Sequence, residues 1–180
     1  MKQILYRIFE TALGPCGLAW SDAETGRPAV VYLQLPCATA EQTEESLAAR
    51  GRRSETCPEN IAAVLEKIRM HLQGRLQDFS AVPLDLQGLG PFSLKVLAAC
   101  REIRPGTTLS YGELARLIDH PGAARAVGQA LAKNPIPLII PCHRVLAANG
   151  GMVGFSAPGG VKTKARLLQL EGVALTIKKD

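Results

Sequence analysis

The chain has 180 residues, of which 47% are hydrophobic, and a net charge of +5. Its length suits one domain or two small ones, and no apolar run approaches the ~20 residues that span a bilayer. Because the N-terminus also lacks the basic-then-apolar pattern of a signal segment, we expect no membrane partner and a cytoplasmic location, or a nuclear one in a eukaryote.

The first part of the chain has the pattern of an antiparallel β-meander. Runs rich in strand-forming residues occupy 3–9, 17–23 and 29–35. Turn-like segments at 13–17 and 24–28 separate them. Short runs joined in this way predict three neighbouring strands of one sheet.

Helices are expected to follow the meander. A polar, helix-prone segment covers 39–51. A second helix is predicted over 57–74, because apolar residues recur there at helical spacing: Ile61, Leu65, Ile68 and Leu72. Residues 78–87 resemble a last strand of the same sheet.

Past a linker-like segment at 88–91, the pattern is helical. A helix near Phe92 has one apolar face, formed by Phe92, Val96, Ala99, Cys100 and Ile103. Ser110 begins a capping box for a helix over 111–118, and another helix runs from about 122 to 133. Two short helices around a tight turn predict a helix-turn-helix, although many helical domains contain such a pair.

The second helix of this pair is unusually rich in small residues. It contains Ala123, Ala124, Ala126, Ala130 and Ala132, together with Gly128. Small side chains allow close approach, either to another helix or to a nucleic-acid backbone. Arg125 is the only long cation in this helix before Lys133, and on its own it is better interpreted as a solvated surface residue.

Charge is divided unevenly along the chain. Residues 1–85 hold 9 Lys/Arg and 11 Asp/Glu, for a net −2, whereas residues 86–180 hold 12 Lys/Arg and 5 Asp/Glu, for a net +7. A basic half suggests a polyanionic partner. A solvated basic surface accounts for the charge equally well.

The five cysteines point to chemistry at one position only. They are widely spaced and form no CxxC pair, which argues against a disulfide framework and against a zinc site. Cys142 stands out because it follows the proline-braced run "NPIPLIIP" and precedes His143. A thiol becomes a good nucleophile only when a base removes its proton, and a neighbouring histidine can do so in a turn or through a water.

A carboxylate offers a third member of such a site. The last predicted helix has an apolar face formed by Val161, Ala165 and Leu168. Glu171 lies three residues after Leu168 and four after Leu167, so it continues this apolar stripe. A buried carboxylate needs a partner, and His143 is a candidate, in the manner of a base oriented by an acid. The alternative is that Glu171 only caps the helix before Gly172.

Residues 147–160, with five glycines, predict a loop whose backbone approaches a flat group, or else a plain hairpin.

Together these segments resemble the O6-alkylguanine-DNA alkyltransferase family. "PCHRV" after "NPIPLII", "SYGELA" and "AARAVG" before it, and "GFSAPGG" and "LLQLEG" after it occur in the family's order over about 91–173. The resemblance implies an α+β fold. Residues 1–87 would form a ribonuclease-H-like antiparallel sheet domain, and 88–180 a helical domain with a helix-turn-helix of winged-helix type.

The resemblance also implies a role for each site residue. Cys142 would accept the alkyl group, His143 would take its proton through a water, and Glu171 would orient His143. Asn134 would be a hinge, and Tyr111 would donate a proton to guanine. The remaining contacts to DNA or the extruded base would come from Arg125, which fills the gap in the base stack, and from Ala124, Val145, Phe155 and Ser156.

The implied function is stoichiometric repair of O6-alkylguanine in double-stranded DNA, with the base turned out through the minor groove and the protein consumed. No cofactor, no metal and no obligate protein partner are implied, and a monomer is expected. Two other functions remain open. One is a lesion-binding protein without transfer, although such proteins have another residue in place of the acceptor cysteine, which this chain keeps as Cys142. The other is a Cys-His hydrolase, which would leave the helix-turn-helix without a purpose.

Overall fold

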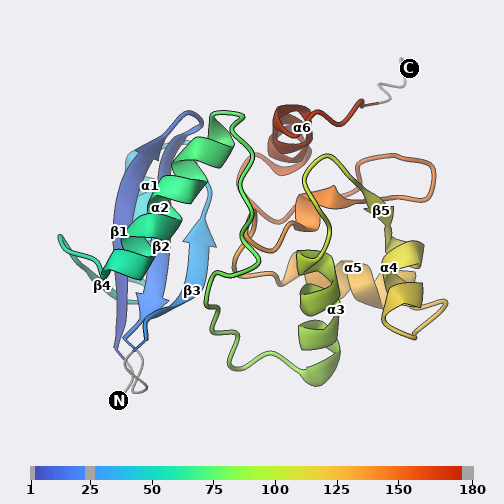
Figure 1. The fold of residues 1–180 in the computed structure, drawn as a ribbon, viewed down its shortest axis with the longest axis horizontal. Coiled ribbons are helices and arrows are strands. Elements are labelled where there is room, and N and C mark those ends of the chain that lie inside the picture. The colour runs from blue at the N-terminus through green and yellow to red at the C-terminus, as the bar shows by residue number, and fades with distance from the viewer. Residues whose placement is uncertain (1–2, 23–26, 176–180) are drawn as a thin grey trace. The chain divides into compact units, whose positions relative to one another are not determined.

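A computed structural model describes residues 3–22 and 27–175 of the chain. The chain divides into two compact units, Met1–Gln87 and Gly88–Asp180 (Figure 1). The fold is mixed α and β, as expected, with a small sheet in the first unit and mainly helices in the second. Within the described residues, no helix has the length and apolar character needed to cross a membrane.

The sheet of the first unit has four strands in the order β3-β2-β1-β4. The first three pair antiparallel, which confirms the predicted meander, whereas the short β4 pairs parallel to β1 and was not predicted. Residues 23–26, within the predicted strand end and turn, lie outside the described part of the chain. The strands are β1 (Ile4–Thr11), β2 (Gly14–Ser21), β3 (Ala29–Gln34) and β4 (Arg52–Arg53).

The second strand begins three residues earlier than predicted, so the turn assigned to 13–17 was wrong over most of its length. Gly14 adopts φ 117°, which a glycine tolerates, and starts the strand directly after a tight turn. Pro15 pairs with Glu10 of β1, but β3 joins β2 only from Gly17 onwards. The proline therefore lies where β2 has no neighbour on its other side, and its missing N–H costs no ladder hydrogen bond.

Two helices cover opposite faces of this sheet. They are α1 (Ala40–Ala48) and α2 (Glu59–Leu72). Leu47 of α1 packs with Tyr6 and Ala19. Arg69 of α2 instead lies over the ring of Phe9, an odd number of residues from Tyr6 and hence on the other face. The predicted apolar stripe of α2 is buried throughout, as expected for a helix that packs on one face of the sheet.

The packing of α1 on the sheet depends on Gly17. A Cβ atom at this position would overlap Cδ1 of Leu47, which is completely buried. We expect Gly17→Ala to lower the free energy of unfolding by about 1–3 kcal/mol, the usual cost of overpacking a core. Urea denaturation measures the change. In a Leu47→Ala background the same substitution should cost less, and equal costs in the two backgrounds would contradict this packing.

The prediction of a last strand at 78–87 was wrong. Only Leu84 bridges to Val30, and the hydrogen bonds on either side join Val30 N to Pro83 O and Asp85 N to Val30 O. Pro83 lacks an N–H, and a turn ends at Val82, where the amide donates to Phe79 O. These two features leave too little extended backbone for a strand.

The second unit holds four α-helices among its described residues, namely α3 (Pro91–Arg101), α4 (Tyr111–Leu117), α5 (Ala124–Ala132) and α6 (Gly160–Leu170). Two short parallel strands, β5 (Leu109–Ser110) and β6 (Val145–Leu146), pair with each other. The capping box of α4 forms as predicted, with Ser110 accepting from the Glu113 amide and Glu113 accepting from the Ser110 amide. The tight connection between α4 and α5 includes Asp119 at φ 61° and Gly122 at φ 87°.

Candidate active site

The segment 134–141 forms a closed loop that presents Cys142. The Asn134 side chain holds the loop from inside: its Oδ1 accepts from Ile136 N at 3.0 Å, and its Nδ2 donates to Ile140 O at 2.8 Å. Leu138 adopts φ 73°, a left-handed conformation that a leucine rarely takes, and its side chain is completely buried. Such strain persists only where surrounding contacts impose it. The loop is thus a rigid support for the residue that follows Pro141.

Cys142 begins a single 3-10 turn, η1 (Cys142–Arg144), so Cys142 and His143 lie in a turn and not in a strand. Cys142 is 6% exposed, and Asn134 Nδ2 also donates to its Sγ at 3.2 Å. Burial raises the pKa of the Cys142 thiol above its ordinary value, while the Asn134 hydrogen bond and the positive charge of Lys164 oppose that shift. The resting group is therefore the thiol, but two neighbours already favour its anion.

Behind the thiol lies a buried ionic cluster, which we call the His143–Glu171–Arg144 cluster. His143 Nε2 and Glu171 Oε1 are 2.9 Å apart, which confirms the predicted pairing of these two residues. Arg144 donates to both carboxylate oxygens, from Nε at 2.8 Å and from Nη2 at 2.7 Å, and its Nη1 donates to Ile103 O. Glu171 is therefore held as a carboxylate at a fixed position, and the imidazole is held by one of its ring nitrogens.

Helix α6 supplies a second buried cation. The predicted apolar face through Val161, Ala165 and Leu168 was wrong in part, because Val161 is 41% exposed and the buried side instead includes Lys164. Lys164 is 1% exposed, and its Nζ donates to Val145 O at 2.7 Å. Burial lowers the pKa of Lys164, and the nearby Cys142 opposes this shift. Lys164 and Cys142 line the same pocket.

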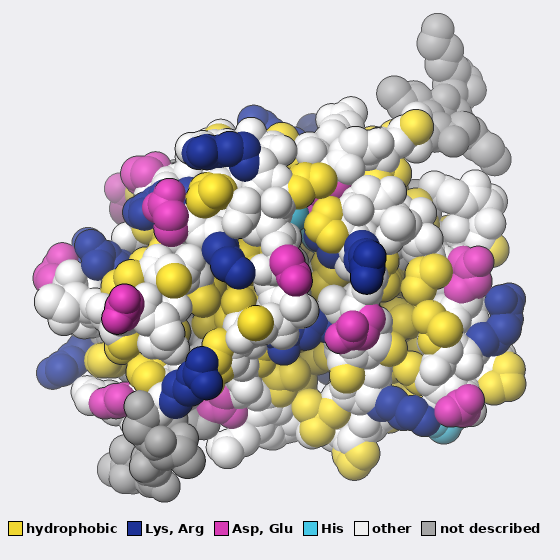
Figure 2. All heavy atoms as spheres, in the orientation of Figure 1, with side chains coloured by type: hydrophobic (Ala, Val, Ile, Leu, Met, Phe, Trp, Pro, Cys, Tyr) yellow, Lys and Arg dark blue, Asp and Glu magenta, His cyan; other side chains and the backbone are white. Residues whose placement is uncertain are grey.

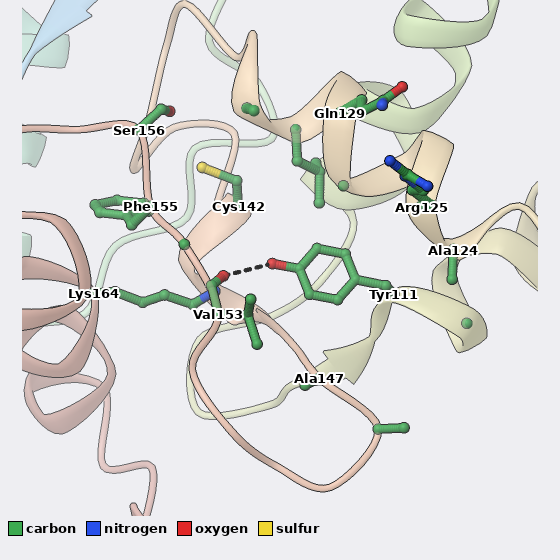
Figure 3. A pocket seen from close by; sticks show the side chains of 16 residues that line it. Tyr111, Ala124, Arg125, Gln129, Cys142, Ala147, Val153, Phe155, Ser156 and Lys164 are labelled. Carbon is green, nitrogen blue, oxygen red and sulfur yellow. Dashed lines mark hydrogen bonds between the residues drawn. The ribbon is translucent and has the colours of Figure 1, made fainter.

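Tyr111 lies opposite Cys142 because the two short strands fix both ends of the site. Tyr111 directly follows β5, and Cys142 lies just before β6, which pairs with β5. The phenol donates to Val153 O at 3.1 Å (Figure 3). Burial raises the pKa of Tyr111, and charge on Cys142 raises it further. Tyr111 thus keeps its proton and remains a hydrogen-bond donor.

An open pocket of about 810 Å³ leads to the thiol (Figure 3). Six of the ten predicted site residues line it: Tyr111, Ala124, Arg125, Cys142, Phe155 and Ser156. The other four do not. Asn134, His143 and Glu171 lie in the layer beneath Cys142, and Val145 contributes its carbonyl to Lys164. Small residues form much of the remaining wall, so the pocket can admit a flat, bulky group.

Three polar residues of this site were missed by the sequence reasoning. The sequence reasoning assigned no role to Arg144, Lys164 or Gln129. Arg144 and Lys164 are both almost fully buried. Charged residues are rarely buried, so the sequence alone gave no reason to place these two in the interior. Within 3–22 and 27–175, no group of three or more His, Cys, Asp or Glu residues is placed to hold a metal ion.

Comparison with known proteins agrees with the motifs around Cys142. The model of the 6-O-methylguanine DNA methyltransferase DNA-binding domain matches residues 91–173. A methylated-DNA–protein-cysteine methyltransferase of Mycolicibacterium paratuberculosis is 38% identical over 168 residues, which cover 93% of this chain and 92% of that protein. The enzyme of the same name from Methanothermobacter thermautotrophicus is 42% identical over 118 residues, covering 66% of this chain and 65% of that protein.

A solved structure extends the likeness to the fold of nearly the whole chain. The Mycobacterium tuberculosis protein OGT, crystallised in complex with DNA, superposes with a TM-score of 0.72 at 34% identity, covering 93% of this chain and 92% of the other. Fold, motif order and sequence identity along the chain therefore agree. The chain belongs to the methylated-DNA–protein-cysteine methyltransferase family.

Proposed function

We propose that this protein repairs O6-alkylguanine in double-stranded DNA by moving the alkyl group irreversibly to Cys142. The observation that carries the proposal is a buried thiol at the end of an open pocket, backed by the His143–Glu171–Arg144 cluster. The family relatives bear the name of this reaction, and one is known in complex with DNA.

The cluster suits removal of the thiol proton. Since burial keeps Cys142 protonated, a base is needed at neutral pH. His143 binds Glu171 through Nε2, so the proton would arrive at its Nδ1, through a water, while Glu171 stabilises the imidazolium that forms. The Cys142 sulfur then forms a bond to the alkyl carbon as the bond from that carbon to O6 breaks, and the electron pair stays on guanine.

The phenol of Tyr111 can assist guanine as the leaving group. The negative charge that develops on the base needs a donor, and this phenol keeps its proton because burial raises its pKa. In the free protein the hydroxyl donates to Val153 O. We propose that guanine takes the place of this carbonyl as acceptor. The thioether on Cys142 is then stable, so each molecule acts once.

The α4–α5 pair is the proposed DNA-binding helix-turn-helix. On the face drawn in Figure 2, Lys and Arg are interspersed with acidic and apolar groups. The net charge of +7 over residues 86–180 would favour contacts to DNA phosphates. Apart from Arg125 and Gln129, the exposed residues of α5 are alanines, which suits insertion into the narrow minor groove. Arg125 would occupy the space of the extruded base, with Ala124 beside it. Backbone near Val145 and Ser156, together with Phe155, would contact the base.

Finer features of the fold belong to the same proposal. We assign 1–87 as a ribonuclease-H-like domain, supported by the sheet order β3-β2-β1-β4 with helices on both faces. We assign 88–180 as a winged-helix-like domain for DNA binding and alkyl transfer, supported by α4 and α5 and the strands β5 and β6. Because the proposed substrate is genomic DNA, we place the protein in the cytoplasm of a prokaryote or the nucleus of a eukaryote.

Intact-protein mass spectrometry tests this function directly. The protein is mixed with a duplex carrying one O6-methylguanine, and peptides are then analysed. We expect one methyl group per molecule, on Cys142, and no further turnover with excess substrate. Cys142→Ala should gain no mass. Binding without mass gain would instead indicate a lesion-binding protein, and continued turnover would indicate a hydrolase.

Arg125 should matter only when a base has to be extruded. We expect Arg125→Ala to slow transfer from duplex O6-methylguanine at least tenfold, while the reaction with free O6-benzylguanine keeps its rate. The reason is that the free base needs no replacement in a stack. Single-turnover rates on both substrates give the comparison. Equal losses on both would remove Arg125 from this role.

A further inference from the structure

Helix α5 offers the pocket two long hydrogen-bonding side chains, one turn apart. Arg125 and Gln129 both line the pocket and are exposed, and their separation of four residues puts them on the same side of the helix (Figure 3). In the part of the chain that the structure describes, neither side chain forms a hydrogen bond or an ion pair with the protein. Their polar groups are thus available to a ligand.

The surroundings of Gln129 favour contact with a large partner. Gly128 and Ala132 flank it on the pocket side of α5, and neither projects beyond the helix backbone far enough to hold a partner away. A glutamine among such residues is the most prominent uncharged polar group on this side of the helix. Its carboxamide can both donate and accept, which neither Arg125 nor an alanine can do.

We infer that Gln129 reads the minor-groove edge of a base pair next to the damaged nucleotide, and so makes repair depend on sequence context. This inference rests on the proposed function, in which Arg125 occupies the vacated position in the stack. Four residues of helix advance by about 6 Å, and stacked bases by about 3.4 Å, so the amide falls one or two base pairs away from the vacancy.

The chemistry of the groove predicts which pair is favoured. Every base pair presents acceptors in the minor groove, but only a pair containing guanine adds a donor, its N2 amino group. The Gln129 amide can donate to an acceptor at any pair. With guanine, its carbonyl can also accept from N2. We therefore expect a neighbouring G·C pair to be favoured over the same pair without that amino group.

Inosine provides the matched test, because it differs from guanine at the minor-groove edge by this amino group alone. Single-turnover rates of methyl transfer are measured at subsaturating protein, with guanine or inosine placed in turn at each flanking position. We expect inosine to slow the wild-type protein by about three- to tenfold at one flank. With Gln129→Ala or Gln129→Met, the same replacement should have no effect. The methionine variant keeps the length of the side chain and removes only its hydrogen bonds.

Two controls separate this inference from the proposed function. Each protein's rate with free O6-benzylguanine is measured as its own reference, so that a change in the pocket itself is told apart from a change in contact with the flanking base pair. Replacing the flanking guanine with 7-deazaguanine alters the major-groove edge only, and should leave every rate unchanged. If transfer occurs but inosine slows wild type and variants alike, or if 7-deazaguanine has the larger effect, the inference is wrong and the proposed function stands. Absence of transfer to Cys142 in any duplex would overturn the proposed function itself.

Discussion

Replacing Arg144 with methionine is expected to lower the free energy of unfolding by about 3–5 kcal/mol, the usual cost of removing one partner from a buried ion pair. Arg144 is 4% exposed, and it donates to both oxygens of Glu171. Without it, the carboxylate stays buried with His143 as its remaining partner among the residues of the cluster. Chemical denaturation of the wild type and the variant, followed by circular dichroism, measures the loss.

A second substitution shows whether the unpaired charge of Glu171 causes the loss of stability. Glu171→Gln in the Arg144→Met background removes that charge and keeps the shape of the side chain, so it should recover a large part of the lost stability. The four proteins form a double-mutant cycle, and we expect a coupling energy above about 1 kcal/mol. If the two single effects simply add, the ion pair does not stabilise this unit in the way its geometry suggests.

Replacing His143 with glutamine is expected to slow methyl transfer by roughly 10²–10⁴-fold at neutral pH, the range by which a positioned general base accelerates a reaction. Glutamine can still donate to Glu171, so the Glu171–Arg144 pair keeps its contacts and the fold should be preserved. Rapid-quench kinetics with a methylated duplex give the rates, and circular dichroism verifies the structure.

The pH dependence of this loss has a definite sign. Burial raises the pKa of Cys142, so without a base the reaction depends on the small fraction of protein molecules in which Cys142 is already a thiolate. Below that pKa, the thiolate fraction grows about tenfold for each pH unit. The ratio of wild-type to variant rates should therefore shrink as the pH rises from 6 to 9. A ratio that stays constant over this range would show that His143 does not act as the base.

Local patterns predicted most of the helices and the pairing of His143 with Glu171. The capping box at Ser110 and the apolar stripe of α2 are decided within one or two turns, so the sequence contains all the information they need. The pairing of Glu171 with His143 could be predicted for a similar reason, because the spacing from Leu167 and Leu168 placed the Glu171 carboxylate on the buried side of the last helix. The family motifs supplied the identity of the thiol and its neighbours.

Features that depend on distant contacts could not be predicted in this way. Two arginines in a row gave no sign that Arg52–Arg53 would pair with β1, since their partner strand lies over 40 residues away. Lys164 and Arg144 look like ordinary surface cations, and only the three-dimensional structure shows the acceptors that make their burial tolerable. The left-handed Leu138 is likewise imposed by the loop around it and not by its own preference.

The ladder between β5 and β6 has a practical consequence for redesign of this protein. It joins the segment ending at Ser110 to the one beginning at Val145, so main-chain bonds hold together the two backbone segments from which Tyr111 and Cys142 extend. The loop that carries Val153 and Phe155 lies outside this ladder. Libraries that vary the loop around Val153, whose carbonyl accepts from the Tyr111 phenol, can therefore widen or narrow the entrance for unnatural alkyl labels while the two backbone segments that carry the phenol and the sulfur stay joined.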